Sequence, residues 1–281
     1  KITYNSIESQ IELARQGHQQ VKSFLDYRLE RIVLTCRTVA MDSKVNEILA
    51  KDIKYCTTSQ QLKDLSTLRV YLEQFQSVQN KFDILRLYVL GDRIYANENK
   101  LVFNLDAVRD TVWYKKTFSE WGWTTYNPPN FMEIPNVVSV VQPIRDFNNY
   151  TRKIGAVRID IPLGEIENML KRASINNSSL TYMVTQDGIL IAASSSQLFS
   201  IYKLDKKYLD KAISSNSSFI PIWDKGRKLW VCADNILDTG WILVTVLPEI
   251  ELIKSINSMQ LQYIIAFVLL FLLVVSINVP A

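Results

Sequence analysis

The chain has 281 residues, of which 48% are hydrophobic and 21% are charged, as is typical of folded globular proteins. Its formal net charge of +4 is too small to indicate a nucleic-acid-binding protein, because phosphate binding needs clustered basic residues. The single histidine excludes sites built from several histidines, and no phosphate-binding glycine motif occurs. We therefore expect a protein that is not an enzyme, with no cofactor, no metal and no nucleic-acid partner.

The three cysteines, Cys36, Cys56 and Cys232, form no C-x-x-C pair, so zinc and thioredoxin-type redox sites have no support. We expect them to be small buried side chains and do not predict a Cys36–Cys56 disulfide.

A long apolar run lies near the C-terminus. Residues 263–277 contain no charge, which predicts a transmembrane helix within 249–281 that the end of the chain cuts short. A buried core helix is the alternative. The chain starts at Lys1 without an initiator Met or a signal peptide, so we expect a fragment that lacks residues at both ends.

Residues 1–80 are predicted to be helical, because they contain one glycine and no proline. An apolar seam with alternating spacings of three and four predicts one unusually long amphipathic helix. Its members are Ile7, Ile11, Ala14, His18, Val21, Leu25, Arg28, Ile32, Cys36 and Val39. We interpret His18 as a packed or partly exposed side chain and not as a ligand or a pH switch. A second helix carries Leu62, Leu65, Leu68, Leu72 and Phe75 on one face.

Residues 81–175 are predicted to form a first α+β module. The expected order is a strand at 82–90, a turn at 91–92, an extended segment at 93–96, a helix at 104–122, strands at 123–126, 137–144 and 154–161, and a helix at 162–172, with 146–153 as a hairpin loop.

A polar linker at 175–179 separates a second, smaller module at 176–248. We expect strands at 180–185, 189–193, 219–223, 228–233 and 241–247, a helix at 204–213, and turns at 224–226 and 238–240. Hairpin connections predict antiparallel sheets, so the fold class is α+β: a long N-terminal helix, two stacked modules and an exit helix from Pro248.

The sequence resembles a double Cache (dCache) sensor region of bacterial membrane receptors. The resemblance is carried by residues 87–95, Trp113-Tyr114, residues 137–144 and 155–161, and it recurs at 182–190 and 240–245. In its sequence pattern the chain is similar to the ectodomains of YesM-like sensor histidine kinases. The resemblance implies two PAS-like modules, a small-molecule pocket in the membrane-distal one, and a homodimer.

The chain departs from the amino-acid-binding members of that family. They carry an Arg two residues before a Trp-Tyr pair and an Asp two residues after a later Tyr. Here Arg109 lies four residues before Trp113, and Pro128 follows Tyr126 at the Asp position.

Aromatic residues that could stack on a sugar or a base remain near these positions. We predict ligand contacts from Trp113, Tyr114, Trp123 and Tyr126, with Trp121 nearby and Arg109 one helical turn before Trp113. Asp146 is a further candidate, although turn capping is its alternative role, and Asp160 is a weaker one on a face that we expect to be wet. Core packing of the aromatic residues and a surface ion pair of Arg109 are the structural alternatives.

The function predicted from sequence is the extracytoplasmic ligand-sensing region of a bacterial transmembrane receptor. We favour a histidine kinase that binds a sugar-like molecule in the membrane-distal module and signals along the helices to the membrane. Residues 1 to about 260 would be extracytoplasmic, with the C-terminal helix in the lipid bilayer. The alternatives are the ectodomain of a chemoreceptor or cyclase-type receptor, a membrane-anchored hydrolase, and a structural stalk.

Overall fold

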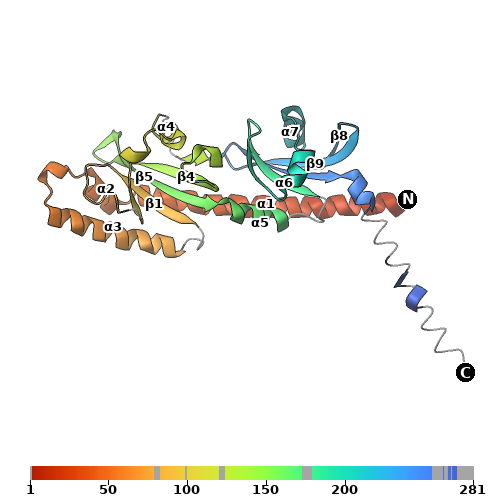
Figure 1. Ribbon diagram of the computed structural model, residues 1–281, viewed down its shortest axis with the longest axis horizontal. Helices are drawn as coiled ribbons and strands as arrows, with labels where there is room; N and C mark the ends of the chain where they lie inside the picture. The colour runs from red at the N-terminus through yellow and green to blue at the C-terminus, as the bar shows by residue number, and fades with distance from the viewer. Residues whose placement is uncertain are drawn as a thin grey trace, which may run out of the picture. The chain divides into compact units, whose positions relative to one another are not determined.

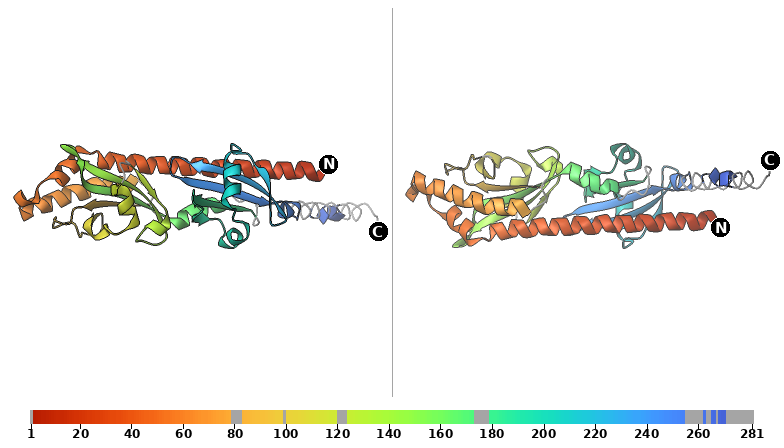
Figure 2. Two further views of the ribbon diagram at one scale, coloured as in Figure 1. Left: turned by 90° about the horizontal axis from the view of Figure 1, so that it is seen from above. Right: turned by 90° about the horizontal axis from the view of Figure 1, so that it is seen from below.

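The computed structural model describes residues 2–78, 83–98, 100–119, 124–172, 179–254, 262, 265–266 and 268–270. The chain forms two compact units (Figure 1). Unit 1 comprises Lys1–Lys22, Leu170–Asn235 and Ile242–Ala281, and unit 2 comprises Ser23–Met169 and Ile236–Trp241. Helix α1 (Ile2–Ala40) is one continuous rod that contributes residues to both (Figure 2).

No helix within the described residues combines the length and the apolarity needed to cross a membrane. Most of the predicted spanning segment, 263–277, lies outside the described residues.

Unit 2 contains a five-stranded sheet in the order β2-β1-β5-β4-β3. Its strands are β1 (Ile84–Val89), β2 (Val102–Asn104), β3 (Thr125–Asn127), β4 (Val137–Asp146) and β5 (Asn149–Pro162). Its helices after α1 are α2 (Ser43–Ala50), η1 (Ile53–Tyr55), α3 (Thr58–Val78), η2 (Asp106–Val108), α4 (Val112–Ser119), η3 (Pro129–Phe131) and the start of α5 (Leu163–Arg172). Strand β1 pairs antiparallel with β5, as β4 does with β5 and with β3. The prediction of an antiparallel sheet is therefore confirmed for these pairs and wrong for β2, which pairs parallel with β1.

The predicted helix at 104–122 is wrong in its first half. The Leu105 amide bonds to the Val89 carbonyl at 2.8 Å, which draws the preceding residues into the sheet as β2. The Asn104 side chain then accepts the Asp106 amide at 2.8 Å, an Asx turn that competes with helix formation. Residues 91–97 form turns and bends, so the extended segment predicted at 93–96 is also wrong.

The two faces of this sheet are both buried and differ in chemistry. Leu87, Val140 and Ile159 share one face by strand alternation, and Cys36 of α1 lies against it, with Sγ 3.9 Å from the Val140 carbonyl oxygen. This contact confirms that the predicted seam of α1 is a packing surface. On the opposite face, an aromatic cluster forms from Tyr88, Leu105, Trp113, Val141 and Ala156.

Unit 1 contains a second five-stranded sheet in the order β7-β6-β10-β9-β8. Its elements are β6 (Leu180–Thr185), β7 (Leu190–Ala193), α6 (Ser196–Tyr202), α7 (Lys206–Ile213), β8 (Ile220–Asp224), β9 (Arg227–Ile236) and β10 (Trp241–Pro248). All five strands were predicted within three residues of these bounds. Helix α6 was not predicted; the Ser195 side chain caps it by accepting the Leu198 amide at 3.3 Å.

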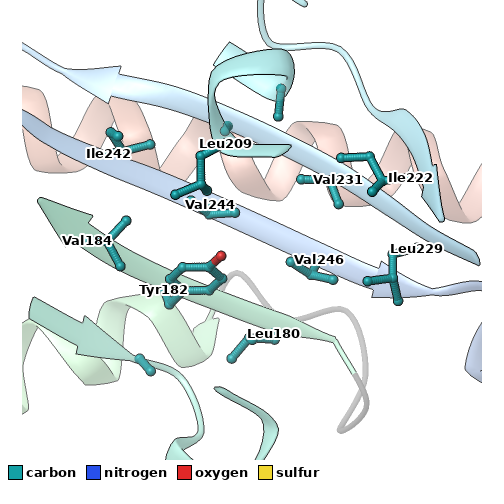
Figure 3. Packing of buried hydrophobic residues seen from close by; sticks show 13 residues of the cluster. Leu180, Tyr182, Val184, Leu209, Ile222, Leu229, Val231, Ile242, Val244 and Val246 are labelled. Atoms are coloured by element: carbon teal, nitrogen blue, oxygen red, sulfur yellow. The ribbon is translucent and has the colours of Figure 1, made fainter. Parts of the chain in front are cut away.

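The sheet of unit 1 is also covered on both faces. Figure 3 shows Val231, Val244 and Val246 on one face, beneath Leu209 of α7. Alternation places Cys232, Asp234 and Thr245 on the other face. That face packs against the first part of α1, where Ala14 belongs to a buried cluster with Leu247 and Leu252.

A candidate ligand site under helix α4 of unit 2

A buried polar cluster occupies the α4 side of the sheet in unit 2. Arg158 of β5 is fully buried, and its guanidinium binds Asp160 with two bonds, Nε to Oδ1 at 2.6 Å and Nη2 to Oδ2 at 3.1 Å. Arg86 of β1 donates from Nε to the second oxygen of Asp160 at 2.8 Å, and the Ser139 hydroxyl of β4 donates to the first. Strand register causes this convergence, because Arg86 pairs with Arg158 and Ser139 pairs with Asp160.

A carboxylate from outside the sheet completes the cluster. Glu133 lies in the irregular segment between η3 and β4, and its side chain is 30% exposed. Its Oε1 accepts from Nη1 of Arg158 and, at 3.4 Å, from the Tyr88 hydroxyl; its Oε2 accepts from the Trp113 indole Nε1 at 2.8 Å. Three donors from two strands and one helix therefore bind one carboxylate that reaches them from a surface segment.

The charges of this cluster balance only when Glu133 is present. Arg86 and Arg158 supply two positive charges, and Asp160 and Glu133 supply two negative ones. Burial opposes the charge on Arg158, but Asp160, Tyr88 and Glu133 together more than compensate, so the pKa of the guanidinium is raised. Burial likewise raises the pKa of Tyr88, which remains a neutral hydroxyl that can donate. Without Glu133, one positive charge would be left unpaired beneath α4.

Aromatic rings surround the guanidinium. The Trp113 ring centroid lies 5.2 Å from Cζ of Arg158 and 5.1 Å from the Tyr88 centroid. The Arg86 guanidinium lies 4.7 Å from the Phe103 centroid. Such cation–π contacts hold the planar cations in fixed orientations, which suits recognition of an anionic group.

The structure places the predicted site residues in different environments. Trp113 is fully buried within the cluster and contributes its indole N–H. Tyr114 is partly buried and stacks on Phe118, with ring centroids 4.5 Å apart. The Arg109 side chain is 61% exposed and pairs with Asp106 at 2.6 Å, the surface ion pair that was its structural alternative.

Two further predicted residues lie away from Trp113, and one is not described. Tyr126 points to the opposite face of β3, because it is Thr125 that bonds to Thr117 of α4 at 2.7 Å. The Tyr126 ring instead contacts Trp241, with centroids 6.0 Å apart. Asp146 accepts the Asn148 amide at 2.8 Å and so acts as a turn cap. Trp123, like Trp121, lies outside the described residues.

Sequence analysis missed the charged core of this site. Asp160 was expected on a wet face, yet it is only 1% exposed, and its carboxylate is enclosed by Arg158, Arg86 and Ser139. The spacing of Arg158 and Asp160, two residues apart in an otherwise apolar strand, was the available signal for a shared buried face. Glu133 had no local signal.

The described residues also contain one group of three potential metal ligands, His18, Cys232 and Asp234, and this group lies in unit 1.

Two units of this kind, each a five-stranded sheet covered by helices and both sharing one long helix, define the class of tandem PAS-like sensory regions. The chain belongs to the double Cache family, because the family model dCache_1, a Cache domain, matches residues 2–256. Domains of this family are extracytoplasmic sensory domains of membrane receptors. The dCache resemblance is thus confirmed, whereas the likeness to YesM-like kinases stays a prediction.

Solved structures with the same fold include sensory domains of chemoreceptors and of a putative histidine kinase. The periplasmic sensory domain of the Campylobacter jejuni chemoreceptor Tlp1 gives a TM-score of 0.65 at 11% identity, covering 89% of this chain and 98% of that one. The extracellular domain of the putative histidine kinase mmHK1S-Z2 gives 0.57 at 18% identity, covering 90% and 99%. The ligand-binding domain of C. jejuni Tlp3 in complex with L-valine gives 0.55 at 14% identity, covering 90% and 97%. The comparison with curated protein sequences gave no match.

Proposed function

We propose that this chain is the extracytoplasmic ligand-sensing region of a bacterial transmembrane receptor, and that unit 2 binds a small molecule at the cluster under α4. The receptor would be anchored through the C-terminal helix and would act through a histidine kinase. Its structural neighbours include sensory domains of a putative kinase and of chemoreceptors, so a chemoreceptor output is the alternative. The chain itself would bind and not catalyse.

The observation that carries the ligand proposal is the carboxylate of Glu133. It is held by Arg158, Trp113 and Tyr88, but it comes from a segment that is neither helix nor strand. A ligand carboxylate could take the same three bonds if that segment moved aside, and the charge balance of the cluster would be kept. We therefore propose a ligand with a carboxylate, which Arg158 would bind in the way that guanidinium groups generally bind such anions.

The sugar-like ligand favoured from sequence is compatible with this chemistry when the sugar carries an acid. Trp113 and Tyr88 present aromatic rings, and hydroxyls of Tyr88 and Ser139 lie within the same cluster. An acidic sugar would use both kinds of group, whereas a neutral sugar that displaced Glu133 would leave one positive charge of the cluster unbalanced.

The test is thermal unfolding of the 281-residue chain with matched ligand pairs, such as glucuronate against glucose, together with amino acids and dicarboxylates. An acid that stabilises should lose most of its effect in Trp113→Phe, which keeps the ring in the core and removes only the N–H donor. Trp113→Ala is unsuitable, because truncating a fully buried Trp costs about 3–5 kcal/mol by itself. Equal stabilisation by an acid and its neutral partner would contradict the role given to Arg158.

We also propose that the receptor is a homodimer through α1. Within unit 2, Phe24, Tyr27 and Leu34 are 51%, 59% and 65% exposed and follow each other at intervals of three and seven residues. These intervals place them on one face of the helix, opposite the buried seam, as in a coiled-coil contact. A shift of paired helices along such a contact would transmit ligand binding toward the membrane.

A further inference from the structure

We propose that His18, Cys232 and Asp234 of unit 1 form a binding site for a borderline-soft divalent metal ion such as Zn²⁺. This site is independent of the ligand site in unit 2, and it departs from our expectation from sequence that the chain has no metal ligand. An ion bound there would fasten α1 to β9 within unit 1.

The three donor atoms already converge on one point. His18 Nε2 lies 3.0 Å from Oδ2 of Asp234, Cys232 Sγ lies 4.0 Å from the same oxygen, and all three atoms lie within 4.8 Å of one another. Zinc bonds of about 2.0–2.3 Å in tetrahedral geometry separate ligand atoms by about 3.3–3.6 Å. Movements of an ångström or less would therefore bring the three atoms around one ion.

The residues come from elements whose packing fixes them. His18 is on the sheet-facing seam of α1, one turn after the buried Ala14, and both His18 and Cys232 are completely buried. Cys232 and Asp234 lie two residues apart in β9, so alternation directs both side chains toward α1. The 13% exposure of the Asp234 side chain gives an ion a route from solvent.

An outer shell of hydroxyls orients these ligands. Nδ1 of His18 bonds to the Thr245 hydroxyl at 2.8 Å, and Thr245 bonds in turn to the Thr181 hydroxyl at 3.2 Å. Ser217 donates to Oδ1 of Asp234 at 2.8 Å, which leaves Oδ2 to face the other two ligands. Metal-binding histidines characteristically donate their second ring N–H to such a partner, which fixes the ring and its tautomer.

The hydroxyls of Thr245 and Thr181 let the cluster keep its hydrogen bonds both without and with a metal ion. Without metal, His18 donates from Nε2 to Asp234 and accepts at Nδ1 from Thr245, which accepts from Thr181. With metal, Nε2 must be free of its proton, so the ring donates from Nδ1 and Thr245 donates to Thr181. Both arrangements use the same distances, because only hydroxyl rotation and the histidine tautomer change.

The charges suit a divalent ion. A thiolate and a carboxylate neutralise two positive charges, so the occupied site is electrically neutral, as a buried site requires. Burial raises the pKa of the Cys232 thiol to about 12, so the thiol is protonated at neutral pH without metal. Binding exchanges that proton, which passes to solvent, for the ion. Three protein ligands leave a fourth position for water, as in open zinc sites.

The test is titration of the full 281-residue chain with Co²⁺, which reports thiolate ligation through a near-ultraviolet charge-transfer band and tetrahedral geometry through its visible bands. We expect one ion per chain, displaced by Zn²⁺. Cys232→Ser should abolish the charge-transfer band, and Asp234→Asn should weaken binding at least tenfold. Thr245→Val should weaken it about 10- to 100-fold while Thr245→Ser binds normally, because only the serine keeps the hydroxyl that orients His18.

The other two cysteines supply matched controls. Cys36→Ser and Cys56→Ser should leave the band unchanged; Cys56 is the partly exposed cysteine at which adventitious binding would occur. Circular dichroism and the thermal midpoint without metal establish that each variant is folded. Absence of the band in the folded wild-type chain, or a band that survives Cys232→Ser and disappears in Cys56→Ser, would overturn the proposal.

Discussion

Replacing Glu133 with alanine tests the chemistry proposed for the ligand site. The change removes the carboxylate that accepts from Arg158, Trp113 and Tyr88. It leaves a buried guanidinium with Asp160 as its remaining anionic partner, and a buried indole N–H without an acceptor. The folded protein should lose stability and should gain a vacant site for a small carboxylate.

The size of the expected loss of stability follows from the kind of hydrogen bond that Glu133→Ala removes. Hydrogen bonds to charged groups contribute about 1.5–3 kcal/mol to the free energy of unfolding. We expect the lower half of that range, about 1.5–2 kcal/mol, because Arg158 keeps both bonds to Asp160 and the Glu133 side chain is 30% exposed. For a chain of this size, the thermal midpoint should fall by about 3–8 °C.

The assay is thermal unfolding in sodium acetate against sodium chloride at equal ionic strength. Acetate should restore stability to Glu133→Ala, by about 1 kcal/mol when its concentration is four times its Kd, and should have no such effect on the wild type. Glu47→Ala is a suitable control, since Glu47 is an exposed residue on α2. If acetate stabilises the wild type, Glu47→Ala and Glu133→Ala equally, the three donors do not form a carboxylate site, and the ligand class that we propose is wrong.

Three further outcomes are expected. Arg109→Ala should change the free energy of unfolding by less than about 0.5 kcal/mol and leave ligand binding intact, because the exposed Arg109 only pairs with Asp106; a tenfold loss of binding in an equilibrium titration would contradict this. Glu98→Gln should lower the free energy of unfolding by about 1.5 kcal/mol at pH 7, because the Glu98 carboxylate accepts three backbone amides. Burial opposes the charge of Glu98, but these bonds hold the pKa of the carboxyl below its usual 4.5. A depressed pKa stabilises the fold at pH values above the pKa of the unfolded state. The difference in free energy of unfolding between wild type and Glu98→Gln, measured in urea, should therefore disappear as the pH falls through the pKa of the folded state. A difference that stays constant down to pH 3 would refute this reasoning. Leu34→Cys in a background without the three native cysteines should crosslink two copies of the receptor at a rate that ligand changes, whereas Glu47→Cys should not; equal crosslinking at both positions would contradict a dimer through α1.

The order and type of most elements could be predicted from local patterns. The seam from Ala14 to Val39 has the period of a helix, and the strands of unit 1 alternate or run apolar between turn residues. Such periodicity reflects which side of each element is buried, so it can be recognised in the sequence without knowing which element packs against that side. It failed at 104–122, where bonds from β1 and the Asn104 side chain override helix formation.

The candidate sites were decided by tertiary structure. Of the residues predicted to bind ligand, Trp113 lies in the charged cluster, while the Tyr126 side chain lies on the face of β3 opposite to Thr125, which contacts α4. Glu133 meets Arg158 across 25 positions, and His18 meets Asp234 across 216. An isolated polar residue in the sequence shows no sign of the partner that neutralises it, since the partner is supplied by strand pairing and by the packing of α1 on a sheet formed much later in the chain. Sequence therefore determined the type and order of most elements, because these follow local periodicity. The fold alone determined that the face of Asp160 is buried and which charges meet there, because both depend on the distances between elements.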